Sequence, residues 1–234
     1  AYEIGVRLVG SEMCIRDSSI SGTSISNQVM TKIIGGSGLG SYTLLGADID
    51  GEATIDASGH SVSLSSDGSR VAIGALGNDG GNGVNSGHVR IYDYNGSAWV
   101  KVGADIDGEA TSDNSGRSVS LSSDGSRVAI GATGNDGNGT RSGHVRIYNY
   151  NGSAWVQVGA DIDGEAAEDK SGQSVSLSSD GSRVAIGAYV NDGNGSNSGH
   201  VRIYNYNGSA WVQVGADIDG EAANDYSGNS VSLS

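Results

Sequence analysis

One unit of sequence repeats along this chain, and that repetition constrains the fold more than any single motif. The marker W-V-x-V-G-A-D-I-D-G-E-A begins at Trp99, Trp155 and Trp211, so successive copies are 56 residues apart, and a degenerate copy occupies residues Tyr42–Ala53. Repeats of this length that are rich in short strands and turns are typical of propeller blades or of a related stacked array. The chain is therefore predicted to stack similar sheets against one another.

The composition is typical of a chain with many short strands and tight turns, and the net charge disfavours some classes of binding partner. Glycine occurs 40 times and proline is absent, and glycine, serine, asparagine and aspartate are the residues of tight turns. The formal net charge of −14 argues against nucleic acid or an anionic membrane surface as a partner. No apolar run approaches the roughly 18 residues of a membrane-spanning helix, so no membrane insertion is expected in this segment. The single cysteine, Cys14, excludes a disulfide framework.

The N-terminal region differs in character from the repeats. The segment Met13–Ser18 resembles the translation of an adaptor used in sequencing libraries, so residues 1–18 are predicted to be a non-native scar that is not part of the fold. Residues 19–41, which contain a Gly-Gly-Ser-Gly stretch, are interpreted as a linker or a degenerate blade remnant.

Each unit contains two predicted hairpins, and the first lies within residues 118–131 of the second unit. Two segments of alternating residues flank Asp124-Gly125, a dipeptide that strongly favours a two-residue hairpin turn. This register places Leu121 opposite Val128. The large aliphatic side chains then share one face of the hairpin, and serine, alanine and glycine share the other. A shift of the register by one residue would destroy this separation of large and small residues.

The second predicted hairpin lies within residues 144–158 and contains Asn151-Gly152, another favoured two-residue turn. A two-residue turn would place Tyr148 opposite Trp155 as an aromatic cross-strand pair. Each unit is thus predicted to be four antiparallel strands with one bulky face and one small face. The bulky face of one sheet can then pack on the small face of the next.

These patterns predict an all-β protein, a β-propeller fragment built of four-stranded antiparallel blades. Residues 42–234 are assigned to blades, namely 46–102, 103–158, 159–214 and a partial unit at 215–234. Closed propellers use about four to eight blades, so the chain is interpreted as an interior part of a longer protein. A β-solenoid is the alternative architecture, which the antiparallel hairpins disfavour.

The ordered motifs of each unit resemble those of the FG-GAP repeat family, known from the β-propeller of integrin α-subunits. In the third unit the matching segments are Asp163–Asp169, Ser171–Val175, Val184–Ala188 and Gly199–Tyr204. The resemblance covers residues 42–234, and it implies a secreted or cell-surface propeller used in adhesion or ligand recognition.

The chain departs from the family pattern in two ways. Two motif residues of the family are replaced: the phenylalanine by Ser58, Ser115, Ser171 and Ser227, and the proline after Gly-Ala by Leu76, Thr133 and Tyr189. The integrin-type calcium loop between the first two strands is reduced to Ser-Ser-Asp-Gly-Ser with one carboxylate, whereas calcium takes six to eight oxygen ligands. The resemblance therefore implies no calcium site at that position.

The second and third units differ at eight positions, all within two loops. One loop precedes the first strand and the other joins strands two and three, so both are expected at the same edge of the assembly, where binding residues are common. Relaxed constraint on solvent-facing loops is the alternative explanation. The candidate ligand-binding residues at this edge are Thr111, Ser112, Asn114, Arg117, Thr133, Thr140, Arg141, Lys170, Tyr189 and Asn197.

The same loops are dense in carboxylates and amides, which could coordinate calcium. The alternative is that these side chains cap turns in their own backbone. His88, His144 and His200 recur at the start of strand three and are expected to be structural or surface residues, because equivalent histidines on neighbouring blades would lie about 10 Å or more apart. The candidate calcium ligands are Asp105, Asp107, Glu109, Asp113, Asp136, Asn138, Asp161, Asp163, Glu165, Asp169, Asp192 and Asn194.

These observations predict a non-enzymatic extracellular or cell-surface binding or adhesion module. Catalysis generally needs an asymmetric set of unlike groups, whereas nearly identical units supply the same residues to every blade. The expected partner is a protein or carbohydrate ligand, and calcium is the only cofactor that the residues suggest. The alternatives are a structural spacer within a large surface protein and an accessory domain of a secreted enzyme.

Overall fold

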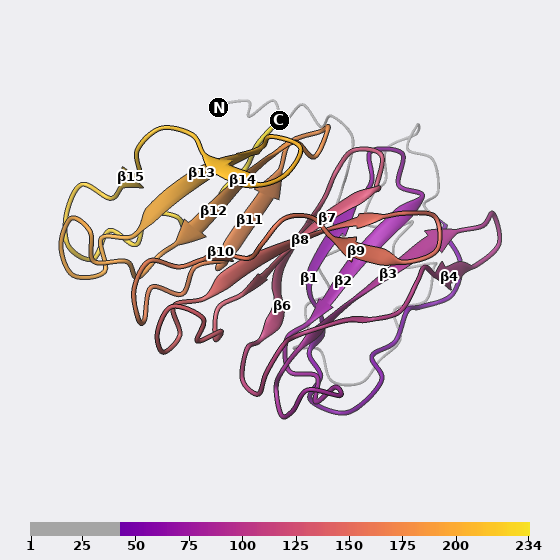
Figure 1. Cartoon of the computed structure of the whole chain (residues 1–234). Coiled ribbons are helices and arrows are strands. Elements are labelled where there is room, and N and C mark those ends of the chain that lie inside the picture. The colour runs from indigo at the N-terminus through magenta and orange to yellow at the C-terminus, as the bar shows by residue number, and fades with distance from the viewer. Residues whose placement is uncertain (1–42) are drawn as a thin grey trace, which may run out of the picture. The chain divides into compact units, whose positions relative to one another are not determined.

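The computed structural model describes residues 43–234, which form strands and loops only (Figure 1). The predictions for residues 1–18 and 19–41 lie outside the described residues. Residues Leu45–Ser234 form one compact unit, and no helix that could cross a membrane occurs in the described part of the chain. The all-β prediction is therefore confirmed.

The strands form three antiparallel sheets, one for each complete unit. The first contains β1 (Ser58–Leu64), β2 (Arg70–Ala75), β3 (His88–Tyr94), β4 (Trp99–Lys101) and β5 (Ile106–Asp107). The second contains β6 (Ser115–Leu121), β7 (Arg127–Ala132), β8 (His144–Tyr150), β9 (Trp155–Gln157) and β10 (Ile162–Asp163). The third contains β11 (Ser174–Leu177), β12 (Arg183–Ala188), β13 (His200–Tyr206), β14 (Trp211–Gln213) and β15 (Ile218–Asp219).

The fourth position of each sheet is divided between two short strands. In the second sheet, β9 pairs with the end of β8 at Tyr148–Tyr150, and β10 pairs with its beginning at His144–Val145. The acidic segment after each tryptophan was predicted to be loop, but two of its residues form the second of these strands. This pairing joins the start of each sequence unit to the preceding sheet.

The first hairpin has the predicted register, with Leu121 paired with Val128. Its turn is held by Asp124, whose Oδ1 accepts hydrogen bonds from Ser122 Oγ at 2.7 Å and from the backbone N–H of Ser126 at 2.9 Å. Such side-chain bonds to a neighbouring backbone N–H favour turns over continued strand. The local sequence therefore suffices to place this turn.

Acid titration tests the hydrogen bonds of the equivalent turn in the third unit. Hydrogen bonds from Ser178 Oγ and from the N–H and Oγ of Ser182 lower the pKa of Asp180 to about 2. Because the folded pKa lies below the ordinary value, this carboxylate stabilises the fold above about pH 4 and loses that effect as the pH falls through about 2. Carboxyl NMR is expected to show the low midpoint, and Ser182→Ala is expected to raise it. A midpoint of 3.8 or above in the unsubstituted chain would contradict this assignment.

The second hairpin differs from the prediction by two residues. Trp155 pairs with Tyr150 instead of Tyr148, and their ring centroids lie 5.2 Å apart. The loop contains four residues, because the N–H of Asn151 donates to the carbonyl of Ala154, and Asn151 Oδ1 accepts from the N–H groups of Ser153 and Ala154. The asparagine side chain thus stabilises a longer turn than Asn-Gly alone suggests. A shift of two residues leaves each side chain on its predicted face.

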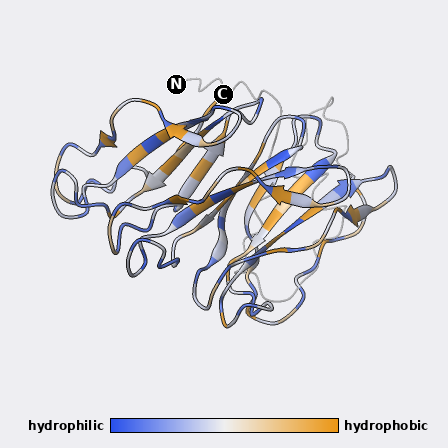
Figure 2. Cartoon of the chain, in the orientation of Figure 1, coloured by the Kyte–Doolittle hydropathy of each residue, from blue (hydrophilic) through white to orange (hydrophobic). Residues whose placement is uncertain are grey.

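The sheets stack through a bulky face and a smaller face, as predicted, but in the opposite direction: the bulky residues of each sheet pack on the smaller face of the sheet before it, not of the next. Figure 2 shows the hydrophobic residues concentrated in the strands and the hydrophilic residues in the loops. Val128 and Ile130 of the second sheet pack against Ala72 of the first, and Val184 and Ile186 of the third sheet pack against Ala129 of the second. The smaller face is small only over its first two strands, because β8 adds buried Val145 and Ile147 to it.

Glycine and serine bring neighbouring backbones close at the centre of this packing. Ser118 Oγ donates to the carbonyl of Gly172 in the next sheet at 2.8 Å, and the Cβ of any larger residue at Gly131 would collide with that same oxygen. Ser120 Oγ accepts from the N–H of Leu177 at 2.9 Å. The serines were predicted only as small residues, and the structure shows that they also hydrogen-bond one sheet to the next.

The partial unit at residues 215–234 repeats these contacts without forming a sheet of its own. Ile218–Asp219 complete the third sheet as β15, and residues 230–234 have no assigned strand. The N–H of Leu233 nevertheless donates to Ser176 Oγ at 3.0 Å, as Leu177 does to Ser120. The contacts at the end of the chain therefore continue the same stacking.

The two variable loops meet at one edge, as predicted. Within the second unit the N–H of Gly134 donates to the carbonyl of Asp113 at 3.0 Å. Between units the N–H of Lys170 donates to the carbonyl of Arg141 at 3.1 Å. We call the surface formed by residues 108–117, 133–143, 164–173 and 189–199 the loop edge.

Candidate functional site

The loop edge carries backbone conformations that side chains rarely adopt. Asn114 and Lys170 occupy equivalent positions before a Ser-Gly pair and have φ angles of 56° and 54°. Arg141 and Asn197, at the second variable loop, have φ angles of 51° and 53°. Left-handed conformations outside glycine carry strain and cluster at functional sites. All four positions are among the candidates predicted from sequence.

A pocket of about 270 Å³ lies between the loops of the second and third units. It joins side chains from four segments that are distant in sequence, and six of the ten candidate ligand-binding residues line it. Its lining residues are Asn114, Arg117, Thr133, Gly134, Arg141, Lys170, Gln173 and Tyr189.

The other four candidates do not line this pocket. Asn197 lines a second pocket of about 190 Å³, together with Lys170 and Asp192. Thr111, Ser112 and Thr140 line neither of these two pockets. The structure therefore brings most of the variable positions together at one interface between sheets.

Three cationic side chains line the larger pocket of an otherwise acidic protein. Arg117 Nε donates to Gln173 Oε1 at 3.1 Å, across the interface between sheets. Lys170 Nζ lies 5.8 Å from the centre of the Tyr189 ring. Arg141 Nη1 lies 3.9 Å from Glu168 Oε2, and both side chains are exposed. A pocket with this lining favours an anionic group, because its field opposes that of the surrounding acidic surface.

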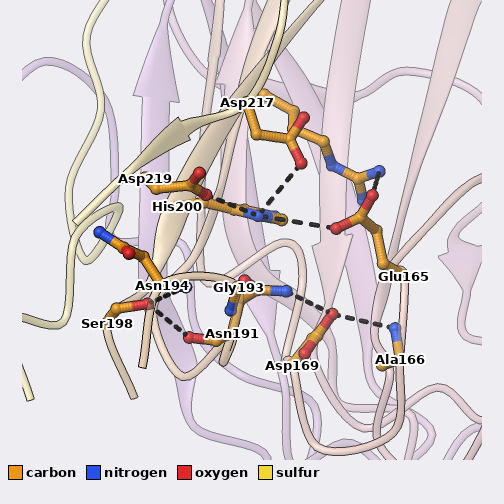
Figure 3. Close-up of polar contacts among 12 residues, drawn as sticks. Glu165, Ala166, Asp169, Asn191, Gly193, Asn194, Ser198, His200, Asp217 and Asp219 are labelled. Carbon is orange, nitrogen blue, oxygen red and sulfur yellow. Dashed lines mark hydrogen bonds and ion pairs between the residues drawn. The ribbon is translucent and has the colours of Figure 1, made fainter. Parts of the chain in front are cut away.

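Several of the candidate calcium ligands instead hold the loops in place. Asp113 is buried, and its Oδ2 accepts from the N–H groups of Glu109 and Ala110 at 3.0 and 2.9 Å and from Asn135 Nδ2 at 3.3 Å. Asp169 makes the equivalent contacts with Ala166 and Asn191 (Figure 3). Asp136, Asp192, Asn138 and Asn194 also bond to loop backbone. The contacts of the four aspartates support the turn-capping alternative, whereas Asn138 and Asn194 donate to the backbone of the following unit and so connect two loops.

The other candidate acids lie along the short strands and beside the histidines. Asp107 and Asp163 belong to β5 and β10, where they pair with His88 and His144. Burial, with a further contribution from neighbouring Asp161, raises the pKa of Asp163. The pairing of these short strands therefore places the acidic residues next to the histidine that begins β3 or β8.

A buried histidine faces two carboxylates in each unit. His144 has 1% of its side chain exposed, and its Nδ1 lies 3.8 Å from Glu109 Oε2 and 3.7 Å from Asp161 Oδ2. Around His200, Glu165 and Asp217 are placed in the same way (Figure 3). The third such set is Glu52, His88 and Asp105, and in each set the ligand atoms lie within 4.8 Å of one another. These clusters could hold a metal ion.

Sequence reasoning missed these clusters because it compared the histidines only with one another. Their burial agrees with the expected structural role, but the carboxylates around them come from the start of the same unit and the start of the next. Asp161 reaches His144 because β10 pairs with β8. The available signal was that the glutamate, the histidine and the aspartate all recur in every unit.

The buried histidines are held in the neutral form. Burial, aided by the charge of Arg146, lowers the pKa of His144 to about 4. Burial is also the largest cause that lowers the pKa of His88 and of His200. A neutral imidazole is the form that coordinates metal ions.

The profile of the FG-GAP repeat matches residues 104–148 and 161–204. No match to a curated protein was found. Among solved structures, hydrazine synthase from Kuenenia stuttgartiensis is 10% identical over 77% of this chain and 42% of its own, with a TM-score of 0.42. The Cps50 (Swd1) beta-propeller domain from Myceliophteria thermophila is 14% identical over 68% of this chain and 42% of its own, with a TM-score of 0.39.

The chain thus spans 42% of the length of each of these two structures. The family resemblance found in the sequence agrees with the matched family profile, and each matched segment contains the first two strands of one sheet and most of the third. Residues 104–148 and 161–204 are therefore FG-GAP repeats, carried on successive blades of a β-propeller module.

Proposed function

We propose that this chain is a non-enzymatic binding or adhesion module, secreted or displayed at a cell surface, that recognises a protein or carbohydrate ligand through the loop edge. The observation that carries the proposal is the convergence of variable residues. Two units that are otherwise nearly identical differ at positions that line one pocket between them. The FG-GAP repeats support the same class of function.

The pocket suits one anionic group of a larger ligand. Its volume of about 270 Å³ falls just below the roughly 300–1,000 Å³ of sites that enclose a whole small molecule. Arg117 and Lys170 supply charge, and Tyr189 supplies an aromatic surface. The expected ligands are therefore glycans that carry carboxylate or sulfate groups, or acidic segments of proteins.

The pocket can be tested by exchanging residues between neighbouring units. Arg117→Gln and Lys170→Asn install the residues that the neighbouring unit has at the same positions, Gln173 and Asn114. On arrays of acidic and neutral glycans and peptides, the unsubstituted chain is expected to bind acidic ligands. The double variant is expected to bind them about ten-fold or more weakly, because two charges that face the ligand are lost.

Lys101→Gln is the matched control for charge. It removes one positive charge at a position where the other units have Gln157 and Gln213, and Lys101 does not line the pocket. Its binding is expected to be unchanged. Equal binding by the double variant, or no binding to any member of the arrays, would contradict the proposal and favour the spacer alternative.

Calcium dependence is tested with the same arrays. The proposal includes calcium at the exposed carboxylates of the loop edge, so a chelator is expected to weaken ligand binding and added Ca²⁺ alone is expected to restore it. Binding that is unchanged in excess chelator would remove calcium from the proposal without affecting the role of the cationic pocket.

A further inference from the structure

The histidine clusters bring together imidazole nitrogens and carboxylate oxygens, and the cationic pocket assigns no role to these atoms. We propose that Glu109, His144 and Asp161 form a binding site for a divalent transition-metal ion such as Zn²⁺, and that Glu165, His200 and Asp217 repeat it. None of these six residues lines the cationic pocket, so this inference does not depend on ligand recognition there, although Glu109 and Glu165 lie on the loop edge.

A buried imidazole without a partner is the first observation. Within residues 43–234, neither ring nitrogen of His144 has a hydrogen-bond partner, and Nδ1 of His200 has none either, although both side chains are only 1% exposed. Buried polar atoms in native proteins nearly always have a partner. In both clusters Nδ1 faces an oxygen of the glutamate and an oxygen of the aspartate, and in the His200 cluster Asp219 Oδ1 also lies 4.0 Å away. A group placed between these atoms would satisfy the imidazole and the carboxylates.

The carboxylates are oriented by a second set of contacts. Glu109 turns Oε1 toward Arg146 Nη1, at 3.4 Å, and leaves Oε2 facing the histidine. Asp161 accepts a hydrogen bond from Gln157 Nε2 on Oδ1, at 2.6 Å, and leaves Oδ2 facing the same nitrogen. Outer partners that fix ligand orientation in this way are typical of metal sites.

The distances are close to those of a coordinated ion. His144 Nδ1 lies 3.7–3.8 Å from the two carboxylate oxygens, whereas tetrahedral zinc with bonds of about 2.0–2.1 Å separates its ligands by about 3.3 Å. The ligand atoms of each cluster lie within 4.8 Å of one another, and rotations of the two partly exposed carboxylates can bring their oxygens closer to the nitrogen and to each other. Three protein ligands leave a fourth position for water or for an external ligand.

The chemical types of the ligand atoms indicate which class of metal ion the clusters would bind. One imidazole nitrogen and two carboxylate oxygens suit zinc and neighbouring transition metals. Calcium takes six to eight oxygens, and a buried imidazole supplies none. The cluster therefore favours a transition-metal ion over Ca²⁺.

The three clusters are expected to differ in affinity because one carries an extra positive charge. Lys101 Nζ lies 2.8 Å from Asp105 Oδ1 in the first cluster. Neutral Gln157 and Gln213 occupy that position beside Asp161 and Asp217. A neighbouring ammonium opposes cation binding, so the cluster of His88 is expected to be the weakest.

Zinc titration of the full chain tests the proposal. A Cys14→Ser background removes the only thiol. Calorimetry and native mass spectrometry are expected to show two Zn²⁺ ions bound in a first class and a third bound more weakly. His144→Gln is expected to remove one of the two tight ions, and the double variant with His200→Gln is expected to remove both. Lys101→Gln is expected to tighten the third ion several-fold.

His60→Gln is the matched control, because His60 belongs to none of the three clusters, and it is expected to leave all three ions bound. If a histidine variant fails to fold by circular dichroism, Asp161→Asn and Asp217→Asn test the same sites from their partly exposed side. Zinc binding that is absent up to about 1 mM, or unchanged in both the histidine and the aspartate variants, would overturn the proposal.

Discussion

Replacing Gly131 with alanine is expected to lower the free energy of unfolding by about 3 kcal/mol, because one methyl group would force two sheets apart. A Cβ at this position would collide with the carbonyl oxygen of Gly172 and with Ser118 Oγ. The same carbonyl accepts the hydrogen bond from Ser118 Oγ that joins the sheets. The measurement is urea unfolding followed by circular dichroism and tryptophan fluorescence.

Gly81→Ala is the matched control for Gly131→Ala. In the part of the chain that the structure describes, no atom beyond the adjacent residues lies within 4 Å of a Cβ built at Gly81, and its φ angle is not in the left-handed region. The control is expected to change stability by less than about 0.5 kcal/mol. Equal stability of the two variants would show that the sheets do not approach as closely at Gly131 as the structure indicates.

Asp113→Ala is expected to cost about 2–3 kcal/mol of unfolding free energy and to disorder the first variable loop. The carboxylate is buried and accepts three hydrogen bonds, including one from the side chain of Asn135. Its removal leaves buried donors without partners, which costs about 1–3 kcal/mol. Because Asn114 follows Asp113 directly and lines the cationic pocket, ligand binding is expected to weaken as well.

Asp136→Ala separates this effect from the loss of one negative charge. Asp136 is exposed on the second variable loop and accepts a hydrogen bond from the N–H of Arg141. Its removal is expected to cost about 1 kcal/mol or less. Amide hydrogen exchange should show faster exchange at Glu109 and Ala110 in Asp113→Ala only. Protection that is unchanged at these two amides would contradict the assigned role of Asp113.

The cationic pocket and the histidine clusters depend on the repeats in different ways. The pocket depends on the few positions where the units differ, such as Arg117 and Gln173. The clusters depend on positions where the units agree, and each is completed by a residue such as Asp161 from the beginning of the following unit. Binding studies with the variants described above can therefore address the two sites separately.

Local sequence was enough to predict the repeating sheets, the register of the first hairpin and the common edge of the variable loops. The Asp124-Gly125 turn and the alternation on either side of it act over a few residues, so their outcome can be derived without knowing the rest of the fold. In the second hairpin the dipeptide alone did not predict the loop length. Asn151 accepts hydrogen bonds from Ser153 and Ala154, and this side-chain geometry selects a longer loop than the dipeptide alone indicates.

Only the tertiary structure decided which side chains meet. The pairing of β10 with β8 carries Asp161 to His144, and Glu109 joins them from the loop that precedes β6. The stacking of sheets likewise places Arg117 beside Gln173 and encloses the pocket between two units. The repeat and its turns follow from interactions between near neighbours in the chain. The two candidate sites depend instead on strand pairing and sheet packing between distant segments, which no local pattern specifies.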